Sequence, residues 1–142
     1  MRRRRGPSAG EKCVVDTLKR LGYTVLHDEA GFFEGRPLLR PDVVVPVLNL
    51  VFEYDGEQHF RTAGRKYYRY RRNGGCDNDR YKDEACASAG IHLARIPFNT
   101  KLSDIPKLVL EAVSIAVENK CLLTASGSDY YDCPRALPRR TR

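Results

Sequence analysis

The sequence has no long apolar run, either inside the chain or near its first residues. Hydrophobic stretches such as Val43–Val45 and Leu108–Leu110 are far shorter than the roughly 20 apolar residues that a bilayer-spanning helix needs. Four arginines follow Met1, but no apolar segment follows them, so the sequence predicts no secretory signal. We therefore expect an intracellular protein of the cytoplasm or nucleus that is neither secreted nor inserted in a membrane.

The sequence also lacks the cysteine spacing of a disulfide framework or a cysteine-rich zinc site. Its five cysteines are odd in number and widely spread, and no C-x-x-C occurs among them. Such cysteines are expected to be free thiols in a reducing compartment. With 142 residues, of which 42% are hydrophobic and 30% are charged, the chain has the composition of one globular domain.

Positive charge is abundant and unevenly distributed. The formal net charge of +7 depends on eight arginines near the two ends of the chain, without which 17 basic residues remain against 18 acidic ones. Residues 61–72 (RTAGRKYYRYRR) carry six basic side chains and no acidic one, so the rest of the body is acidic. This separation predicts a polyanion such as nucleic acid at the basic parts and cations at the acidic part.

The same distribution predicts the domain organisation. We expect a flexible basic arm at residues 1–7, a single folded domain at residues 8–121, and a basic, loosely ordered tail at residues 122–142. The tail contains glycine, serine, proline and arginine without a clear hydrophobic period.

Hydrophobic periodicity and breaker residues predict seven elements in the order α-β-β-β-α-β-α. The expected helices cover residues 8–21, 77–89 and about 103–120, and the expected strands cover residues 23–27, 42–47, 50–55 and 91–97. Val14, Leu18 and Leu21 recur at i, i+4 and i+7 and are expected to form the buried stripe of the first helix. Ser103 is expected to cap the last helix, with Pro106 tolerated in its first turn. The chain is therefore predicted to be α/β, with a mixed sheet of about four strands flanked by helices.

Acidic residues gather on the two middle strands. Only two residues separate these strands, which predicts a tight antiparallel hairpin that pairs Asp42 with Asp55 and Val44 with Glu53. Alternation along the strands would then place Asp42, Glu53 and Asp55 on one face. Like charges at such short range repel each other unless a cation or a shared proton relieves them. Carboxylates on rigid strands suit Mg²⁺ or Mn²⁺, whereas the alternative is a hairpin end whose acids are simply hydrated.

Two further residues allow two interpretations each. His59 lies just beyond Gly56, where the chain can turn back, and could be a general acid or base, or an ordinary histidine. Glu11 lies three residues after Ser8 in the spacing of a capping box, in which the glutamate bonds a backbone N–H. Its carboxylate could equally lean over the acidic face and complete a metal shell.

The basic segment at residues 61–72 suits contacts with phosphates. Arg65, Arg69 and Arg72 are spaced at i, i+4 and i+7, so a helical turn would place them in one stripe, and the neighbouring tyrosines could stack on unpaired bases. The alternative is a solvated surface loop. The predicted nucleic-acid-binding residues are Arg61, Arg65, Lys66, Arg69, Arg71 and Arg72.

An ordered set of motifs resembles the PD-(D/E)xK nuclease superfamily. The set comprises the helix glutamate of GEKCVVDTLKRLGY, the LHDE turn, RPDVVVP, VFEYDGEQHF and the closing DNDRYKDEACASAGIHLARIPFN. The likeness is greatest to the branch that holds the very-short-patch mismatch repair endonucleases, the EDxHD homing endonucleases, and small nuclease-like proteins of phages and large DNA viruses. It runs from Glu11 to about Asn99.

The resemblance implies a restriction-endonuclease-like core with a defined set of site residues. Asp42 would be the central metal ligand, Asp55 and Glu53 would ligate the metal directly or through water, His59 would be catalytic, and Glu11 would contribute from the first helix. One departure is clear, because Asp55 stands where the superfamily places a lysine that orients the attacking water or neutralises the phosphate. His59 could replace that lysine, or Lys82 or Lys66 could reach in from another element.

The sequence thus predicts an endonuclease dependent on Mg²⁺ or Mn²⁺ that hydrolyses phosphodiester bonds in DNA, in repair, recombination, or homing or restriction. The alternative is a catalytically inactive nucleic-acid-binding module on the same fold, which the missing lysine favours. An RNA-directed nuclease would differ only in substrate, and a homodimer would permit cleavage of both strands.

Overall fold

The fold comes from a computed structural model, which describes residues 6–56 and 75–118. The elements of the described residues follow the predicted order. They are α1 (Ala9–Arg20), β1 (Leu26–His27), β2 (Val43–Val45), β3 (Leu50–Asp55), α3 (Gly75–Ala89), β4 (His92–Pro97) and α4 (Ile105–Glu118), with short 3-10 turns η1 (Pro46–Leu48) and η3 (Leu102–Asp104). No helix within residues 6–56 and 75–118 has the length and apolar character that crossing a bilayer requires.

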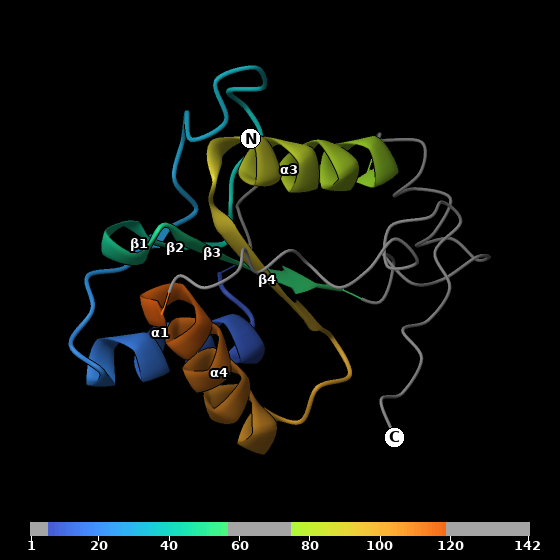
Figure 1. Cartoon of the computed structure of the whole chain (residues 1–142). Coiled ribbons are helices and arrows are strands. Elements are labelled where there is room, and N and C mark those ends of the chain that lie inside the picture. The colour runs from blue at the N-terminus through green and yellow to red at the C-terminus, as the bar shows by residue number, and fades with distance from the viewer. Residues whose placement is uncertain (1–5, 57–74, 119–142) are drawn as a thin grey trace.

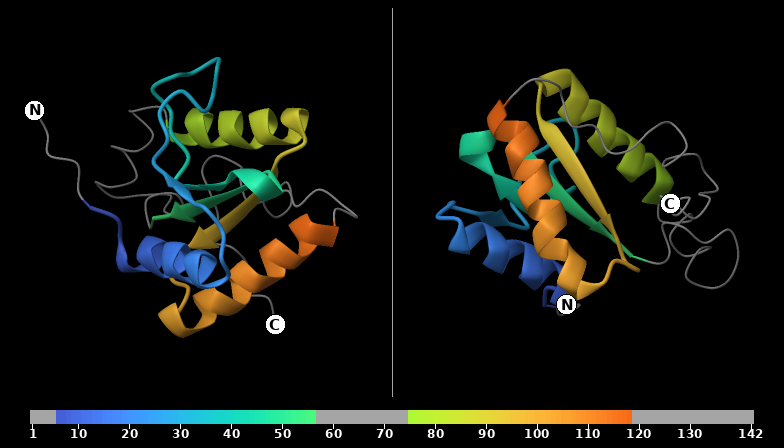
Figure 2. Two further views of the ribbon diagram at one scale, coloured as in Figure 1. Left: turned by 90° about the vertical axis from the view of Figure 1, so that its left-hand side faces the viewer. Right: turned by 60° about the horizontal axis from the view of Figure 1, so that its bottom comes forward.

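The four strands form one mixed sheet, as predicted. Their order is β1-β2-β3-β4, with antiparallel pairing in the first two pairs and parallel pairing between β3 and β4. Parallel neighbours need a crossover connection, and α3 lies in the connection between β3 and β4. Figures 1 and 2 show that α3 covers one face of the sheet while α1 and α4 cover the other.

The main hydrophobic core lies between the sheet and the helices α1 and α4. Side chains from all three layers meet there, among them Val14, Leu18, Phe52, Ile96 and Val109. A smaller cluster lies on the α3 side and consists of Phe33, Val44, Val51, Cys86 and Leu93. Because strand residues alternate between faces, β2, β3 and β4 each contribute to both clusters.

The first helix forms and ends where its sequence predicts. Ser8 is the N-cap and its Oγ accepts a hydrogen bond from the Glu11 N–H at 3.2 Å, while Gly22 takes a positive φ of 90° just after the helix. Gly10 lies against the ring of Tyr54, where a Cβ would overlap the ring. The absence of a side chain at residue 10 therefore lets the first turn of α1 approach the end of β3.

The register of the β2–β3 hairpin differs from the prediction by two residues. Val43 pairs with Phe52, Val44 with Val51, and Val45 with Leu50, so the strand predicted to continue to residue 47 ends at Val45. Residues 46–49 form the connection as η1 followed by Asn49 in the left-handed region, with φ 48°. A proline at residue 46 cannot donate to a strand ladder, which ends β2 early. The two-residue turn and the pairing of Asp42 with Asp55 were therefore wrong.

Three smaller expectations were also wrong. Leu21 is 42% exposed, because the chain leaves the helix at that residue and only Val14 and Leu18 of the stripe are buried. The strand expected at residues 23–27 is confined to Leu26–His27, the part that pairs with β2. Ser103 lies inside η3 and α4 begins at Ile105, so Ser103 does not cap that helix.

Candidate active site

Helix α3 turns a charged stripe toward the sheet. Asp79, Lys82, Asp83 and Cys86 follow the i, i+3, i+4, i+7 spacing that in most helices is apolar. Asp79 and Lys82 are buried, with exposed fractions of 4% and 9%. Charged groups are retained in such positions only with partners, so the sheet below α3 must supply them.

Glu53 supplies the partner of Lys82. The Lys82 Nζ donates hydrogen bonds to Glu53 Oε1 at 3.0 Å and to the backbone oxygen of Arg40 at 2.8 Å. Glu53 lies in the middle of β3 and is 4% exposed, whereas Arg40 lies in the segment that leads into β2. The amine of Lys82 is thus fixed between a helix, a strand and a loop.

Asp42 lies beside Glu53, immediately before β2. Its Oδ2 accepts a hydrogen bond from the Tyr54 N–H at 2.7 Å, and its carboxyl group shares a hydrogen bond with Glu53. Asp42 is partly exposed, whereas Glu53 is buried, so the pair opens to solvent on the Asp42 side. The structure therefore brings together two of the three predicted strand acids and the amine of Lys82.

Both carboxyl groups of the pair hold protons more tightly than usual. Burial raises the pKa of Glu53 to about 8, with the neighbouring Asp42 adding to the effect and Lys82 opposing it. Burial also raises the pKa of Asp42 to about 6, although the bond from the Tyr54 N–H and the charge of Lys82 lower it. A proton on Glu53 at neutral pH is consistent with its hydrogen bond to Asp42.

Asp55 lies on the same face but belongs to a separate ion network. Its Oδ1 accepts a hydrogen bond from Arg95 Nη1 at 2.8 Å, and the two side chains are each 1% exposed. Arg95 also bonds Asp83 Oδ1 at 2.7 Å and lies 3.7 Å from Asp79 Oδ1. The guanidinium therefore links β3 and β4 to the charged stripe of α3, and a metal at Asp55 would compete with Arg95.

Glu11 agrees in part with both interpretations, the helix cap and the position near the acidic face. Its backbone N–H takes part in the Ser8 cap, but its side chain contacts His27 Nε2 at 3.2 Å. The charge of Glu11 contributes to the raised pKa values of Asp42 and Tyr54, which places it near the acidic pair. Glu11 and His27 therefore lie at the edge of the site rather than in its buried part, with side chains that are 20% and 37% exposed.

The remaining predicted residues lie outside the described residues. They are His59, Lys66 and the arginines Arg61, Arg65, Arg69, Arg71 and Arg72, which all fall within residues 57–74. Their roles stay predictions.

Within residues 6–56 and 75–118, no group of three or more histidine, cysteine, aspartate or glutamate side chains is arranged to hold a metal ion. Mg²⁺ commonly uses only one or two carboxylates and completes its octahedron with water and substrate oxygens. The donor pair Asp42 and Glu53 fits that requirement, and the negative charge gathered under α3 favours a cation. The alternative of a merely hydrated hairpin end does not describe Glu53, which is buried.

Sequence reasoning missed Arg95 and named Lys82 only as one of several substitutes. The charged stripe on α3 could have indicated both residues, because charged side chains at the spacing of a buried helix face need charged partners. Comparison with family models, curated proteins and solved structures found no match to the chain.

Proposed function

We propose that the protein is a metal-dependent endonuclease that hydrolyses phosphodiester bonds in DNA. The observation that supports this most strongly is the convergence of Asp42, Glu53 and Lys82 from three separate segments of the fold. The order of elements and the mixed sheet agree with the restriction-endonuclease-like core that the sequence motifs imply. The proposal therefore includes a restriction-endonuclease-like core.

Asp42 and Glu53 would hold the Mg²⁺ or Mn²⁺ ion, with Asp42 on the side open to solvent and substrate. A bound metal supplies a more acidic water and polarises the scissile phosphate. The proton that Glu53 holds at neutral pH would leave when the metal binds, since a ligating carboxylate must be ionised.

Lys82 is the residue that we assign to the role of the missing superfamily lysine. Its Nζ is already adjacent to Glu53 and anchored to the Arg40 carbonyl, so it can offer its positive charge beside the metal ligands. An amine there would neutralise the phosphate or orient a water in the transition state. His59 remains the other candidate, and as a general acid or base it would complement Lys82 rather than exclude it.

Glu11 and Asp55 have supporting positions in this proposal. Glu11, with His27, would adjust the charge at the mouth of the site. Asp55 would position β3 and α3 through Arg95, and it would join the metal only by exchanging that partner. Residues 61–72 would contact phosphates, which position the substrate without specifying sequence.

The alternative function, a nucleic-acid-binding module without turnover, is favoured by two contacts. Lys82 occupies one oxygen of Glu53, and Arg95 occupies one oxygen of Asp55. If these ion pairs are purely structural, the acidic cluster stabilises the fold and binds no metal.

Cleavage of supercoiled plasmid DNA in Mg²⁺, Mn²⁺ or EDTA separates the two functions. We expect nicked or linear product in either metal, none in EDTA, and a loss on the order of 10²–10³-fold in Asp42→Asn. Asp16→Asn removes the same charge from an exposed position of α1 and should cleave as the wild type does. Residual activity that is equal in the wild type and Asp42→Asn would contradict the metal site. Binding without cleavage in every metal would favour the module.

A further inference from the structure

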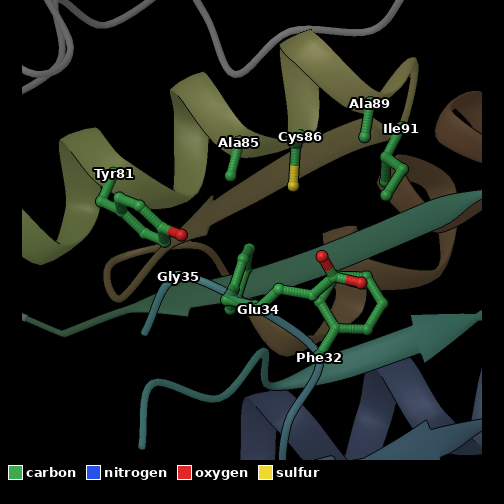
Figure 3. A pocket seen from close by; sticks show the side chains of 9 residues that line it. Phe32, Glu34, Gly35, Tyr81, Ala85, Cys86, Ala89 and Ile91 are labelled. Atoms are coloured by element: carbon green, nitrogen blue, oxygen red, sulfur yellow. The ribbon is translucent and has the colours of Figure 1, made fainter. Parts of the chain in front are cut away.

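A cavity of about 450 Å³ lies between α3 and the loop that precedes β2. Figure 3 shows Tyr81, Ala85, Cys86 and Ala89 facing it from α3, with Phe32, Glu34 and Gly35 on the opposite side. Its size falls within the usual range for small-molecule sites. The lining residues are Phe32, Phe33, Glu34, Gly35, Tyr81, Ala85, Cys86, Ala89 and Ile91.

Three aromatic rings from both sides of this cavity contact one another, two from the loop and one from α3. Phe32 and Phe33 meet edge to face with ring centroids 5.0 Å apart, and Phe33 meets Tyr81 in the same way at 6.1 Å. Phe33 is only 4% exposed, so it holds the other two rings in place. The edge-to-face contacts hold these rings at steep angles to one another.

Polar groups surround the aromatic rings. The Arg36 guanidinium lies 4.5 Å from the Tyr81 ring centroid, and its Nη1 donates to Asn78 Oδ1 at 3.0 Å. Gly35 lies so close to the Tyr81 hydroxyl that a Cβ would overlap it. The exposed Glu34 adds a carboxylate acceptor to the cavity lining. An apolar slot with one cation and one acceptor at its edge suits a flat heterocycle that carries amino groups.

The cavity is connected to the acidic pair by two segments. On α3, Tyr81 lines the cavity and the next residue, Lys82, bonds Glu53. In the loop, residues 32–35 form the other wall, and the backbone oxygen of Arg40 a few residues later accepts the second bond of Lys82. A ligand in the cavity therefore lies close to the proposed site of phosphodiester cleavage.

We propose that the cavity takes one unpaired nucleobase of the strand that is cleaved. The inference rests on the proposed function for its choice of nucleic acid, and it adds a substrate class, namely DNA with a bulged, mismatched or single-stranded base. Stacking on Phe32, or on the face of Tyr81 opposite Arg36, would hold the base, and Glu34 would accept from its amino group. Fully paired DNA keeps its bases stacked inside the duplex and cannot fill the cavity without the cost of extrusion.

The test uses a DNA duplex that carries one extrahelical 2-aminopurine, with the fully paired duplex as its control. Binding is measured in EDTA through the 2-aminopurine emission, so that cleavage plays no part. We expect the wild type to change the emission of the extrahelical base and to bind that duplex more tightly than the paired one. Ala85→Leu fills the cavity and should reduce this preference by about tenfold, as the loss of one base stacking interaction would.

Two further variants keep the result interpretable. Ala89→Leu fills the cavity from an exposed position at the end of α3, where a larger side chain needs no repacking, and should act like Ala85→Leu. Ala87→Leu is the matched control, because Ala87 is exposed on the same helix and does not line the cavity.

An unchanged preference in both filling variants would overturn the base site, even if the plasmid is cleaved in Mg²⁺. Absence of an emission change with the wild type would overturn it as well. An emission change that is lost in both filling variants, without plasmid cleavage in any metal, would support the base site and overturn the nuclease activity.

Discussion

The two faces of the sheet differ in chemistry, because the face under α1 and α4 has an apolar core whereas the face under α3 combines a smaller apolar cluster with buried charges. Under α1 and α4, the side chains that meet β3 and β4 are apolar, as Phe52 and Ile96 are. Under α3, the alternate residues of the same strands include Glu53, Asp55 and Arg95. The charged stripe of α3 forms ion pairs with Glu53 and Arg95. Both faces are buried, so the difference lies in what burial requires. Apolar groups need only close packing, whereas charged groups need specific partners.

The two faces should also differ in how their stability depends on pH. The buried side chains of the main hydrophobic core, such as Phe52 and Ile96, carry no titrating group, so their packing energy is expected to be nearly the same at any pH at which the protein folds. The charged face depends on which carboxyl groups carry protons and which cations face them. The proposed active site lies on this charged face, whose stability depends on pH and on bound cations.

The largest losses in the free energy of unfolding are expected when one side chain is truncated on each face. Arg95→Met removes the cation that Asp55, Asp79 and Asp83 share and should cost about 3–5 kcal/mol at pH 8. Phe52→Ala leaves a cavity in the apolar core and should cost a similar amount, about 3–5 kcal/mol.

Chemical denaturation at pH 5.5 and pH 8 distinguishes the two losses. The Arg95→Met loss should shrink in acid, where carboxyl groups without their cation can take up protons. The Phe52→Ala loss should stay constant. Equal pH dependence in the two variants would contradict the comparison of the faces.

A smaller effect is expected for Lys82→Met. Loss of the amine raises the pKa of Glu53 further, because Lys82 is one of the groups that lower it. The variant should therefore lose about 1–3 kcal/mol at pH 8.5 and much less at pH 6, where Glu53 is protonated. Lys12→Met, an exposed position on α1, is the matched control for the lost charge. If the proposed function is correct, Lys82→Met also loses plasmid cleavage at a pH where it is fully folded.

The wild type should become less stable as the pH rises from 6 to 8 without metal. The pKa of Glu53 is about 8 in the folded protein against 4.5 for an ordinary glutamate, so in this window the folded state binds more protons than the unfolded state. Asp42, with a pKa of about 6, contributes mainly below this window. The expected decrease in the free energy of unfolding is up to about 2 kcal/mol. Glu53→Gln should abolish it, and a decrease that persists in that variant would assign the titration to another group.

The smallest effect concerns the helix caps. Ser8→Ala removes the bond from the Glu11 N–H and should cost about 1 kcal/mol. Ser103→Ala should leave the free energy of unfolding unchanged, because Ser103 lies within η3 and α4 begins only at Ile105. Thermal unfolding of both variants side by side measures the difference. A similar loss in the two would mean that Ser103 supports the start of α4 after all.

The strand β3 and the common face of its acids could be predicted from the sequence. An apolar run followed by alternating acids defines both the limits of the strand and the orientation of Glu53 and Asp55. The hairpin register could not, because the rule for two-residue turns ignored Pro46 and the left-handed Asn49. Turn geometry depends on backbone angles that a count of intervening residues does not contain.

The partners across the α3 face were harder to predict. Asp55 and Arg95 are 40 residues apart in sequence, and parallel pairing of β3 with β4 is what brings them together. Lys82 entered the prediction only as one substitute among several, because its helix does not show a clear apolar face. Periodicity analysis looks for apolar residues at the buried spacing, and α3 carries charges there instead.

The two-residue difference in the hairpin has an evolutionary consequence. Since side chains alternate along a strand, shifting the β2–β3 pairing by an even number of residues leaves the acids beneath α3, as the observed register does. A single inserted residue within a strand would instead drive carboxylates into the layer occupied by Phe52 and Ile96. Natural relatives and laboratory libraries should therefore accept length variation inside these strands in steps of two, with odd steps confined to the turn at residues 46–49.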